Sequence, residues 1–335
     1  MPMLKRILEL GCTLIDYERI VDKQGRRLVF FGRFAGLAGM VDTLWAFGQR
    51  LKWEGINTPF EEIKQTIHYN GLNEIKQHLS KVGETIENKG LPSVITPLVV
   101  GLAGYGNVSR GAQEILSILP VEEVEPQEIK TVYTKPSNTC LYKVVFKEEH
   151  MVEPIEKDTL FDLHEYYTHP ERYRSVFEQY LPHLTILMNC IYWDARYPRF
   201  VTKTFLKKLF SKKEKTRLRV IGDISCDING AVECNVKTTE PGNPVYTYNP
   251  LTDEIKDGYE GEGVIILAVD NLPCELPRES STSFSESLWR FVPDIVQADY
   301  FVEFKNLNLP PEIKNAVIVY NGRLTPNYQY IAKYL

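Results

Sequence analysis

The sequence predicts an α/β fold with a doubly wound, largely parallel sheet, and three observations lead to this prediction. Short apolar runs, typical of strands that are covered on both faces, recur along the chain. Stretches of helical periodicity lie between them, as the crossovers of a parallel sheet require. One apolar run ends directly in a glycine-rich turn that opens a helix. The 335 residues also exceed the roughly 250–300 at which a single core stops growing, so we expect two domains.

The elements of this sheet can be placed from their periodicity. The expected strands are residues 95–102, 122–125, 185–191, 219–224 and 263–268. The expected helices are residues 61–70, 72–87 and 112–119. Small residues at Ala35, Gly36, Ala38 and Gly39 precede the apolar segment 41–51. We therefore expect a long connecting helix there that lies close against other backbone.

The opening segment contains too little structure to fold alone. A helix is expected over residues 3–11, followed by strands at 13–16 and 27–31 with a turn at 22–25 between them. One helix and two short strands cannot bury a core of their own. This segment must therefore belong to a larger domain.

Composition and charge exclude several classes of protein. The hydrophobic share of 43% and the charged share of 25% are those of a globular protein. A net charge of −5 gives no general attraction to nucleic acid or anionic lipid, so we expect neither as a partner. The apolar runs are far shorter than the roughly 20 residues that span a bilayer, so we expect no membrane association.

The cysteines and histidines predict neither a disulfide framework nor a metal site. The six cysteines are scattered and form no C-x-x-C pair, so we expect reduced thiols. With no export signal evident, this favours a cytoplasmic location. His164 and His169 lie five residues apart rather than the four of a zinc-protease helix, and Pro170 follows. The two histidines would point in different directions.

The strongest local signal for chemistry is the glycine turn after residues 95–102. Gly104 would make the tight turn, and Gly106 would let a pyrophosphate approach the backbone. Ser109 stands where a third glycine is usual and still permits close packing. The start of the next helix offers free N–H groups and a positive dipole end to phosphate. This context favours a dinucleotide site over an ordinary turn.

Dinucleotide sites usually place an acidic residue at the end of the second strand, where it binds the adenosine ribose. Glu125 lies 19 residues after Gly106 and is the first choice for this role, with Glu122 and Glu123 as alternatives. A carboxylate repels the 2′-phosphate of NADP, which favours NAD on charge grounds. The choice between NAD and NADP stays open.

Two further strand ends carry polar residues. They are the segment from Asp223 to Ser225 and the segment that begins with Asp270 and Asn271. Ligands of open parallel sheets bind outside the carboxyl ends of the strands. Alternatively, these residues cap the next turn or helix. Together with the glycine turn, they outline one crevice.

Several blocks of the sequence together resemble the lysine-ketoglutarate reductase family, the lysine-forming saccharopine dehydrogenases. These blocks are residues 25–27, 31–39, 104–111, 189–192, 223–225 and 270–279. The likeness covers nearly the whole chain and is to the reductase half of bifunctional aminoadipic semialdehyde synthase, with the N-terminal part of the first domain absent.

The resemblance implies a domain organisation. Residues 53–299 would form the dinucleotide-binding Rossmann domain. Residues 1–52 would be the remnant of an N-terminal substrate domain with the connecting helix, and residues 300–335 would return to that domain. The second Rossmann-like domain would thus be incomplete and built from both chain ends. The family's acid–base lysine and histidine precede this region, so we expect a longer protein or a separate polypeptide to supply them.

The resemblance also implies an activity and a set of contacts. The activity is the reversible, NAD- or NADP-dependent condensation of L-lysine with 2-oxoglutarate to saccharopine. The implied cofactor contacts are Arg26, Gly104, Tyr105, Gly106, Asn107, Ser109, Tyr192, Gly222, Asp270 and Asn271. The implied substrate contacts are Phe31, Asp223, Ile224 and Ser225. No catalytic residue is assigned within the chain. Two alternatives are a nucleotide-binding or regulatory protein without turnover and a related enzyme such as alanine dehydrogenase.

Overall fold

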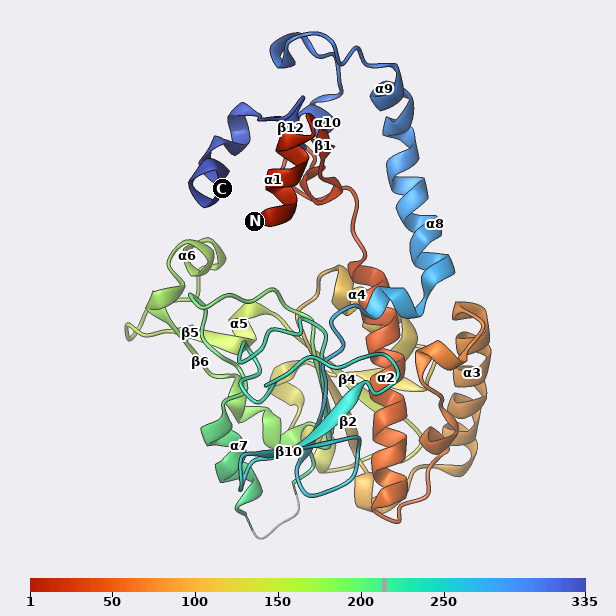
Figure 1. Ribbon diagram of the computed structural model, residues 1–335. Helices are drawn as coiled ribbons and strands as arrows, with labels where there is room; N and C mark the ends of the chain where they lie inside the picture. Colours follow the sequence, from red (N-terminus) through yellow and green to blue (C-terminus); the bar gives the residue numbers. More distant parts are fainter. Residues whose placement is uncertain (213–215) are drawn as a thin grey trace. The chain divides into compact units, whose positions relative to one another are not determined.

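The computed structural model describes residues 1–212 and 216–335, which form two compact units. The larger unit is Gly32–Pro277. The smaller unit combines Met1–Phe31 with Arg278–Leu335 and is therefore built from both ends of the chain (Figure 1).

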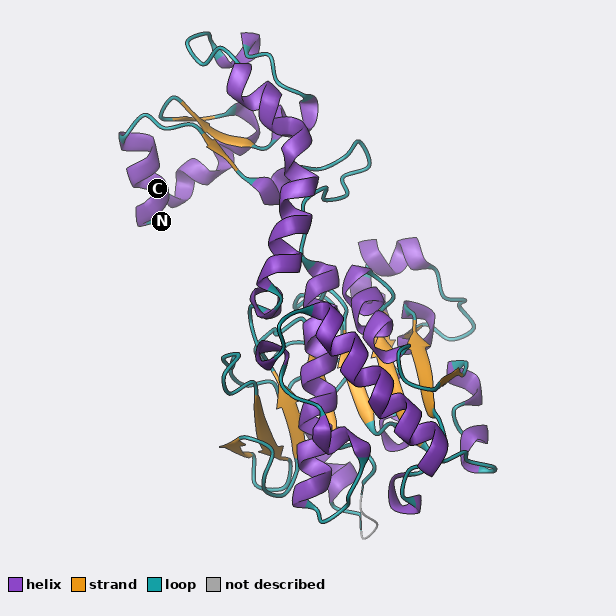
Figure 2. Cartoon of the chain, turned by 90° about the vertical axis from the view of Figure 1, so that its right-hand side faces the viewer, coloured by secondary structure: helices purple, strands orange, loops and turns teal. Residues whose placement is uncertain are grey.

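A mostly parallel sheet forms the centre of the larger unit (Figure 2). Within the described residues it has eight strands in the order β10-β9-β11-β8-β7-β2-β4-β3. They are β2 (Leu98–Ala103), β3 (Val121–Glu123), β4 (Leu141–Phe146), β7 (Ile186–Asn189), β8 (Val220–Asp223), β9 (Val245–Asn249), β10 (Glu254–Asp257) and β11 (Val264–Leu267). All neighbours from β11 to β3 pair in parallel. The predicted α/β class and doubly wound sheet are confirmed.

The edge formed by β9 and β10 was not expected from the sequence. These two strands pair antiparallel with each other, and β9 pairs antiparallel with β11. Antiparallel edge strands are common on parallel sheets. The five strands expected from apolar runs are all present, each within a few residues of its predicted bounds.

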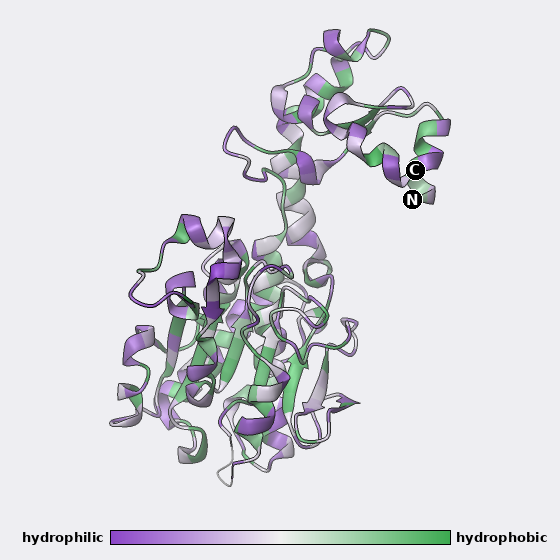
Figure 3. Cartoon of the chain, turned by 90° about the vertical axis from the view of Figure 1, so that its left-hand side faces the viewer, coloured by the Kyte–Doolittle hydropathy of each residue, from purple (hydrophilic) through white to green (hydrophobic). Residues whose placement is uncertain are grey.

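Two hydrophobic cores lie on the two faces of the sheet. Leu98, Val100 and Leu102 of β2 pack into one core with α2 (Gly32–Trp53), α3 (Leu72–Lys89) and α4 (Asn107–Leu116). Val99 packs into the other core with α7 (Lys203–Phe210). This alternation follows from the two-residue period of a strand. Figure 3 shows the strands as the apolar layer of the unit.

Helices α2 and α4 are in direct backbone contact. A Cβ atom at Gly36 would overlap the carbonyl oxygen of Val108, and one at Gly111 would overlap that of Arg33. The expectation that the small residues before position 41 permit close approach is confirmed. The helix itself begins earlier than predicted, at Gly32.

Two local predictions are wrong. Residues 61–70 do not form a helix but two 3-10 turns, Pro59–Glu62 and Thr66–His68. The buried carboxylate of Asp42 accepts hydrogen bonds from the backbone N–H and hydroxyl of Thr66, and this tertiary contact overrides helical periodicity. Residues 27–31 form no strand, and only an isolated bridge joins Val21 to Arg27.

Three smaller elements complete the outer part of the larger unit. Helix α5 (Glu148–Met151) leads into β5 (Val152–Pro154), which pairs antiparallel with β6 (Tyr173–Ser175). Helix α6 (Leu163–Thr168) lies between these two strands along the chain. This hairpin with its helix is separate from the central sheet.

The smaller unit contains a three-stranded sheet within the described residues. Its order is β1-β12-β13, with β1 (Leu14–Ile15), β12 (Val317–Tyr320) and β13 (Arg323–Leu324). Its helices are α1 (Pro2–Glu9), α8 (Pro277–Leu288), α9 (Val292–Gln297) and α10 (Pro311–Asn315). Its own core includes Ile20, Val29, Phe291, Ile313 and Val317.

The compact units divide the chain at 31/32 and 277/278, whereas the resemblance led us to divide it at 52/53 and 299/300. Helix α2 packs wholly within the larger unit rather than connecting the two. The assignment of dinucleotide and substrate roles to separate domains stays a prediction.

Candidate functional site

A cavity of about 290 Å³ lies at the carboxyl ends of β2 and β7. It is lined by Gly104, Tyr105, Gly106, Glu148, Met151, Tyr166, Tyr167, Cys190, Ile191, Tyr192, Tyr197 and Phe200. After β2 the chain runs to β3 and β4 on one side, and later strands fill the other side from β7 onward. The cavity therefore lies at the topological switch point, where ligands of doubly wound sheets bind.

The glycine turn forms one wall of this cavity. Gly104 has a φ of +94° and lies against the loop after β7, where a Cβ would come 3.0 Å from Cγ2 of Ile191. Gly106 precedes the first turn of α4, and a Cβ there would meet no described atom within 4 Å. The space beside Gly106 is thus open at a helix N-terminus, which has no side-chain cap within the described chain. This geometry fits an anionic group such as a pyrophosphate.

Asn107 and Ser109 of the same segment have different roles. Asn107 is exposed at the first position of α4. Ser109 is buried, and its hydroxyl accepts a hydrogen bond from the side chain of Gln113. Ser109 therefore packs within the fold and does not line the cavity, and its implied cofactor contact stays a prediction.

The acidic residue of the cavity is Glu148, which was not among the predicted residues. It lies two positions after β4, which is the strand beside β2. The hydroxyl of Tyr167 donates a 2.6 Å hydrogen bond to Oε1 of Glu148. Burial and the nearby charge of Glu148 raise the pKa of Tyr105, so this hydroxyl stays protonated. A carboxylate with two tyrosines beside it thus faces the glycine turn.

Glu125 follows the second strand along the chain, as predicted, but that strand does not lie beside β2. Glu125 follows β3, which is the outermost strand, and β4 separates β3 from β2. Glu125 is exposed and does not line the cavity, and Glu123 of β3 pairs with Lys143. The second strand along the chain is therefore not the second strand in space. Glu148 follows the strand that lies beside β2 and lines the cavity, and the ribose contact of Glu125 stays a prediction.

Asp223 is buried in a polar network behind the cavity. Its side chain is 1% exposed, and its two oxygens accept hydrogen bonds from Asn189 at 2.7 Å and Asn235 at 2.8 Å. Tyr246 in turn donates to the side-chain oxygen of Asn235. Burial raises the pKa of Asp223 to about 6, although the two amides oppose the shift. Both carboxylate oxygens of Asp223 are thus engaged by protein donors, and its implied substrate contact stays a prediction.

The neighbours of Asp223 pack rather than line the cavity. Gly222 lies beneath Thr43 of α2, because a Cβ would come 2.5 Å from the Thr43 hydroxyl oxygen. Ile224 packs against Gly39, and Ser225 donates a hydrogen bond to the carbonyl of Ile191. The Ser225 bond joins the loop after β8 to a loop that does line the cavity.

Residues 152–327 match the family model described as alanine dehydrogenase/PNT, C-terminal domain. The chain belongs to this family. The match begins at β5 and extends through the loops after β7, β8 and β11. None of the helices in residues 1–212 and 216–335 has the length and apolar character that a bilayer span requires.

This alanine dehydrogenase/PNT family member is similar to longer proteins over almost its whole length. It is 37% identical to alpha-aminoadipic semialdehyde synthase of Arabidopsis thaliana over 99% of the chain and 32% of the relative. It is 35% identical to alpha-aminoadipic semialdehyde synthase, mitochondrial, of Bos taurus over 99% of the chain and 37% of the relative. The chain thus spans about a third of the length of these relatives.

More distant relatives share the fold. Saccharopine dehydrogenase [NAD(+), L-lysine-forming] of Emericella nidulans is 26% identical over 86% of the chain and 62% of the relative. A solved structure of L-alanine dehydrogenase superposes with a TM-score of 0.54 at 14% identity, over 99% of this chain and 72% of the other. The structural likeness agrees with the Rossmann-type fold.

The remaining implied residues of this family member lie outside the cavity, with one exception. Tyr192 is 81% exposed and lines the cavity. Asp270 and Asn271 are exposed after β11, beyond β8 and β7 in the sheet order, and do not line it. Arg26 and Phe31 belong to the smaller unit.

Within the smaller unit, both residues already have partners. The guanidinium of Arg26 forms a 2.7 Å ion pair with Asp22. The ring of Phe31 stacks on Phe284 at 5.5 Å and contacts the edge of Tyr17 at 6.2 Å. Their implied contacts with cofactor and substrate stay predictions.

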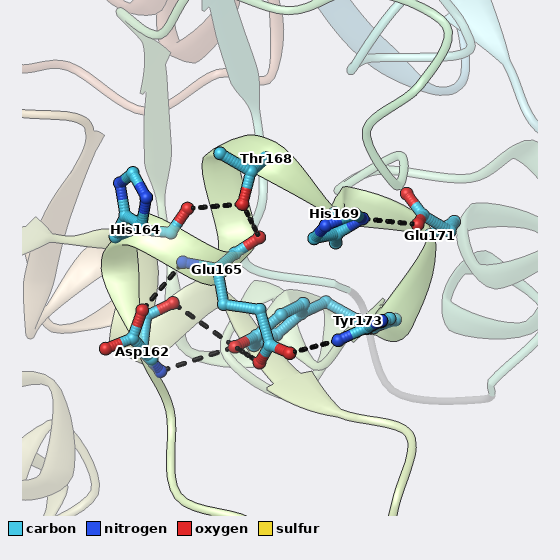
Figure 4. A network of polar contacts seen from close by, with 8 residues as sticks. Asp162, His164, Glu165, Thr168, His169, Glu171 and Tyr173 are labelled. Carbon is cyan, nitrogen blue, oxygen red and sulfur yellow. Dashed lines mark hydrogen bonds and ion pairs between the residues drawn. The ribbon is translucent and has the colours of Figure 1, made fainter.

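The segment around α6 contains polar contacts but no metal-like arrangement (Figure 4). His169 bonds to Glu171 at 3.1 Å, and His164 projects from the other side of the turn. Asp162 caps α6 by accepting from the N–H of Glu165, and Glu165 also accepts from Tyr173. Among residues 1–212 and 216–335, no cluster of three metal-ligating side chains occurs. These contacts fix α6, from which Tyr166 and Tyr167 extend to the cavity.

Sequence reasoning missed Glu148, Tyr166 and Tyr167. The two tyrosines are adjacent between His164 and His169, but nothing in this local sequence marks them as cavity residues. The usable signal for Glu148 was that the mostly apolar run 141–146 is followed, after Lys147, by two glutamates, while the run 98–103 is followed by Gly104. That run had not been recognised as a strand.

Proposed function

We propose that this chain is the dinucleotide-binding part of an NAD(P)-dependent oxidoreductase of lysine metabolism. The reaction would be the reversible reductive condensation of L-lysine with 2-oxoglutarate to saccharopine. The names of the relatives at 34–37% identity and of the saccharopine dehydrogenases support this reaction. The observation that carries the proposal is the cavity that joins Gly104, Gly106 and Glu148 at the switch point of the sheet.

The residues around the cavity support a division of labour along a dinucleotide. The open space beside Gly106 would hold the pyrophosphate against the N-terminus of α4. Glu148, held by Tyr167, would accept hydrogen bonds from the adenosine ribose. Tyr192 and the buried Cys190 after β7 would lie toward the nicotinamide. Burial raises the pKa of the Cys190 thiol, so this wall stays neutral.

Glu148 favours NAD over NADP. A carboxylate that binds the ribose hydroxyls repels a 2′-phosphate at the same place. The described residues that line the cavity include no lysine or arginine that would offset this repulsion. We therefore propose NAD as the preferred cofactor, with NADP as the weaker ligand.

In this reaction the cavity residues would bind the cofactor and would not transfer protons. When bound, the nicotinamide would supply a hydride to the carbon–nitrogen double bond that the ε-amine of lysine forms with the ketone of 2-oxoglutarate, with loss of one water. The side chains of this chain bind and orient the dinucleotide. The resemblance places the family's acid–base lysine and histidine before this region. We therefore propose that they come from a longer protein or from a separate polypeptide.

Oxidation of NADH and NADPH by the purified chain, followed by ultraviolet absorbance, tests the reaction. Lysine and 2-oxoglutarate are supplied together and each is omitted in turn. Turnover that requires both substrates supports the reductase within this chain alone. NADH binding measured by fluorescence without turnover supports a cofactor part that needs another polypeptide. The absence of both binding and turnover contradicts the proposal.

A catalytically incomplete nucleotide-binding or regulatory protein is the alternative. The observation that favours it is that the cavity lining contains glutamate, tyrosine and cysteine but no lysine or histidine. A complementation assay separates the two functions. The chain is mixed with the region of a relative that carries the missing lysine and histidine, and turnover is measured. If the chain is part of an enzyme, turnover should be recovered. A regulatory protein should bind NADH and stay inactive.

For location we keep the cytoplasm as the proposal. The mitochondrial names of the mammalian relatives make mitochondria the competing site. Fractionation of cells that express the full natural gene product decides between them.

A further inference from the structure

Two carboxyl groups of the larger unit face each other in its interior. Asp42 of α2 is 0% exposed, and Glu275 at the end of the 3-10 turn Leu272–Glu275 is 5% exposed. Oδ1 of Asp42 accepts from the N–H of Thr66 at 2.7 Å and from its hydroxyl at 2.9 Å. Oδ2 of Asp42 and both oxygens of Glu275 have no donor among the described residues. Within the described part of the chain, these three buried carboxyl oxygens thus have no hydrogen-bond donor at normal distance.

Such an arrangement is stable only if the pair holds a proton. Two buried carboxylates in contact cannot both ionise, because each charge lacks solvent and repels the other. Burial and the charge of Asp42 raise the pKa of Glu275. Burial also raises the pKa of Asp42. The other titratable groups that act on the pair are His68 of the turn Thr66–His68 and Cys274, and neither is a permanent cation.

The pair joins helix α2 to the turn that ends the larger unit. Helix α2 opens the larger unit, and the turn Leu272–Glu275 closes it just before Pro277. The same turn follows directly on Asp270 and Asn271 at the carboxyl end of β11. Leu272 also packs against Gly39 of α2, so an apolar contact accompanies the carboxyl pair.

We propose that Asp42 and Glu275 share one proton, and that this buried hydrogen bond is a positioning device that fixes the Asp270–Asn271 turn to α2. Glu275 donates and Asp42 accepts, while Thr66 holds the other oxygen of Asp42. The shared proton is a property of the fold. Only its effect on ligand binding rests on the proposed cofactor site.

The first test compares wild type with Glu275→Gln in thermal unfolding between pH 5 and pH 9. An amide can donate to Asp42 but cannot ionise, so Glu275→Gln keeps the bond at every pH. In wild type the folded state holds a proton that the unfolded state releases above about pH 4.3, so its stability falls as pH rises. The melting temperature of Glu275→Gln minus that of wild type should therefore grow by about 5 °C or more over this range. Parallel curves overturn the proposal.

Three further measurements complete the test. The exposed Glu84→Gln on α3 is the matched control and should run parallel to wild type. A carbonyl stretch of a protonated carboxyl group should be present in the infrared spectrum of wild type at pH 7.5 and absent from Glu275→Gln, and its absence from wild type overturns the shared proton. Glu275→Ala should weaken NADH binding by about tenfold, in line with a lost hydrogen bond to a charged group, while Glu275→Gln binds as wild type does. If wild type binds no NADH, the proposed function fails, and the pH and infrared results still decide on the shared proton.

Discussion

The hydroxyl of Tyr167 donates a hydrogen bond of 2.6 Å to Oε1 of Glu148. Glu148 follows β4 of the central sheet, whereas Tyr167 belongs to α6 outside it. The bond therefore links the carboxylate after the sheet strand to a helix that also lines the cavity, and it holds the carboxylate in one orientation. A carboxylate that is held in one orientation loses less entropy when it binds a ligand hydroxyl.

Removal of the Glu148 carboxylate should weaken NADH binding and reduce the preference over NADPH. Charge-assisted hydrogen bonds contribute about 1.5–3 kcal/mol, so Glu148→Ala should bind NADH about 10- to 100-fold more weakly. NADPH should lose much less, because the repulsion of its 2′-phosphate disappears at the same time. Fluorescence titration with both nucleotides measures this. Glu149→Gln, at the exposed neighbouring position, is the control. Equal losses for both nucleotides contradict the role of Glu148.

Tyr167→Phe should have a smaller effect in the same direction. It removes one hydrogen bond to Glu148 while the ring stays in place, which corresponds to about 0.5–1.5 kcal/mol or a 2- to 10-fold loss in NADH affinity. Tyr173→Phe loses a hydroxyl that bonds to Glu165 in the same segment and serves as the control for general loosening around α6. If Tyr173→Phe weakens NADH as much as Tyr167→Phe does, the effect is not specific to Glu148.

Two glycine substitutions in one helical segment should separate stability from binding. Gly111→Ala forces a methyl group against the backbone of α2 and should cost about 1–3 kcal/mol of unfolding free energy. Gly106→Ala places its methyl group in open space, so the free energy of unfolding should stay near that of wild type. The same methyl group would occupy the space proposed for the pyrophosphate, so NADH binding should fall more than tenfold, on the order of the cost of overpacking a site. Urea denaturation and NADH titration of both variants check this, and the reverse pattern would contradict it.

The buried Asp223 predicts a fall in stability between about pH 4 and pH 6. Its pKa is about 6 in the folded protein, whereas the ordinary value is 3.8, so the folded state binds more protons in this interval. Stability from this group is complete below pH 4 and falls by about 3 kcal/mol as pH rises through 6. Asp223→Asn should match wild type near pH 4 and lack this fall. Urea denaturation at several pH values measures the difference, with the exposed Asp257→Asn as the control.

The strands and the glycine turn could be predicted because their signals are local. Residues 98–103 are all apolar or glycine, and Gly104 follows at once, so strand and turn are visible in one window. The strands Val220–Asp223 and Val264–Leu267 are also recognisable from their apolar residues alone. Buried parallel strands differ from all other elements in having no polar face.

Glu148 could not be predicted as the acidic residue of the cavity, because its place beside the glycine turn is set by the order of the strands in the sheet and not by their order in the sequence. Glu125 follows the next strand along the chain, but β4 inserts between β3 and β2. The burial of Asp223 could not be predicted from the sequence either. A carboxylate at a strand end can be buried when other segments supply donors, and here Asn189 and Asn235 donate hydrogen bonds to it. The failed helix at 61–70 has the same origin, because Asp42 recruits the backbone of Thr66.

The close approach of α2 and α4 at Gly36 and Gly111 restricts how the two helices can move. Backbone meets backbone there, so no side chain can change its rotamer to absorb a displacement. Helix α2 begins at Gly32, directly after the last residue of the smaller unit's first segment, and α4 places its first turn beside the cavity. A displacement of either helix must therefore be shared by the other, and the first turn of α4 lies beside the cavity.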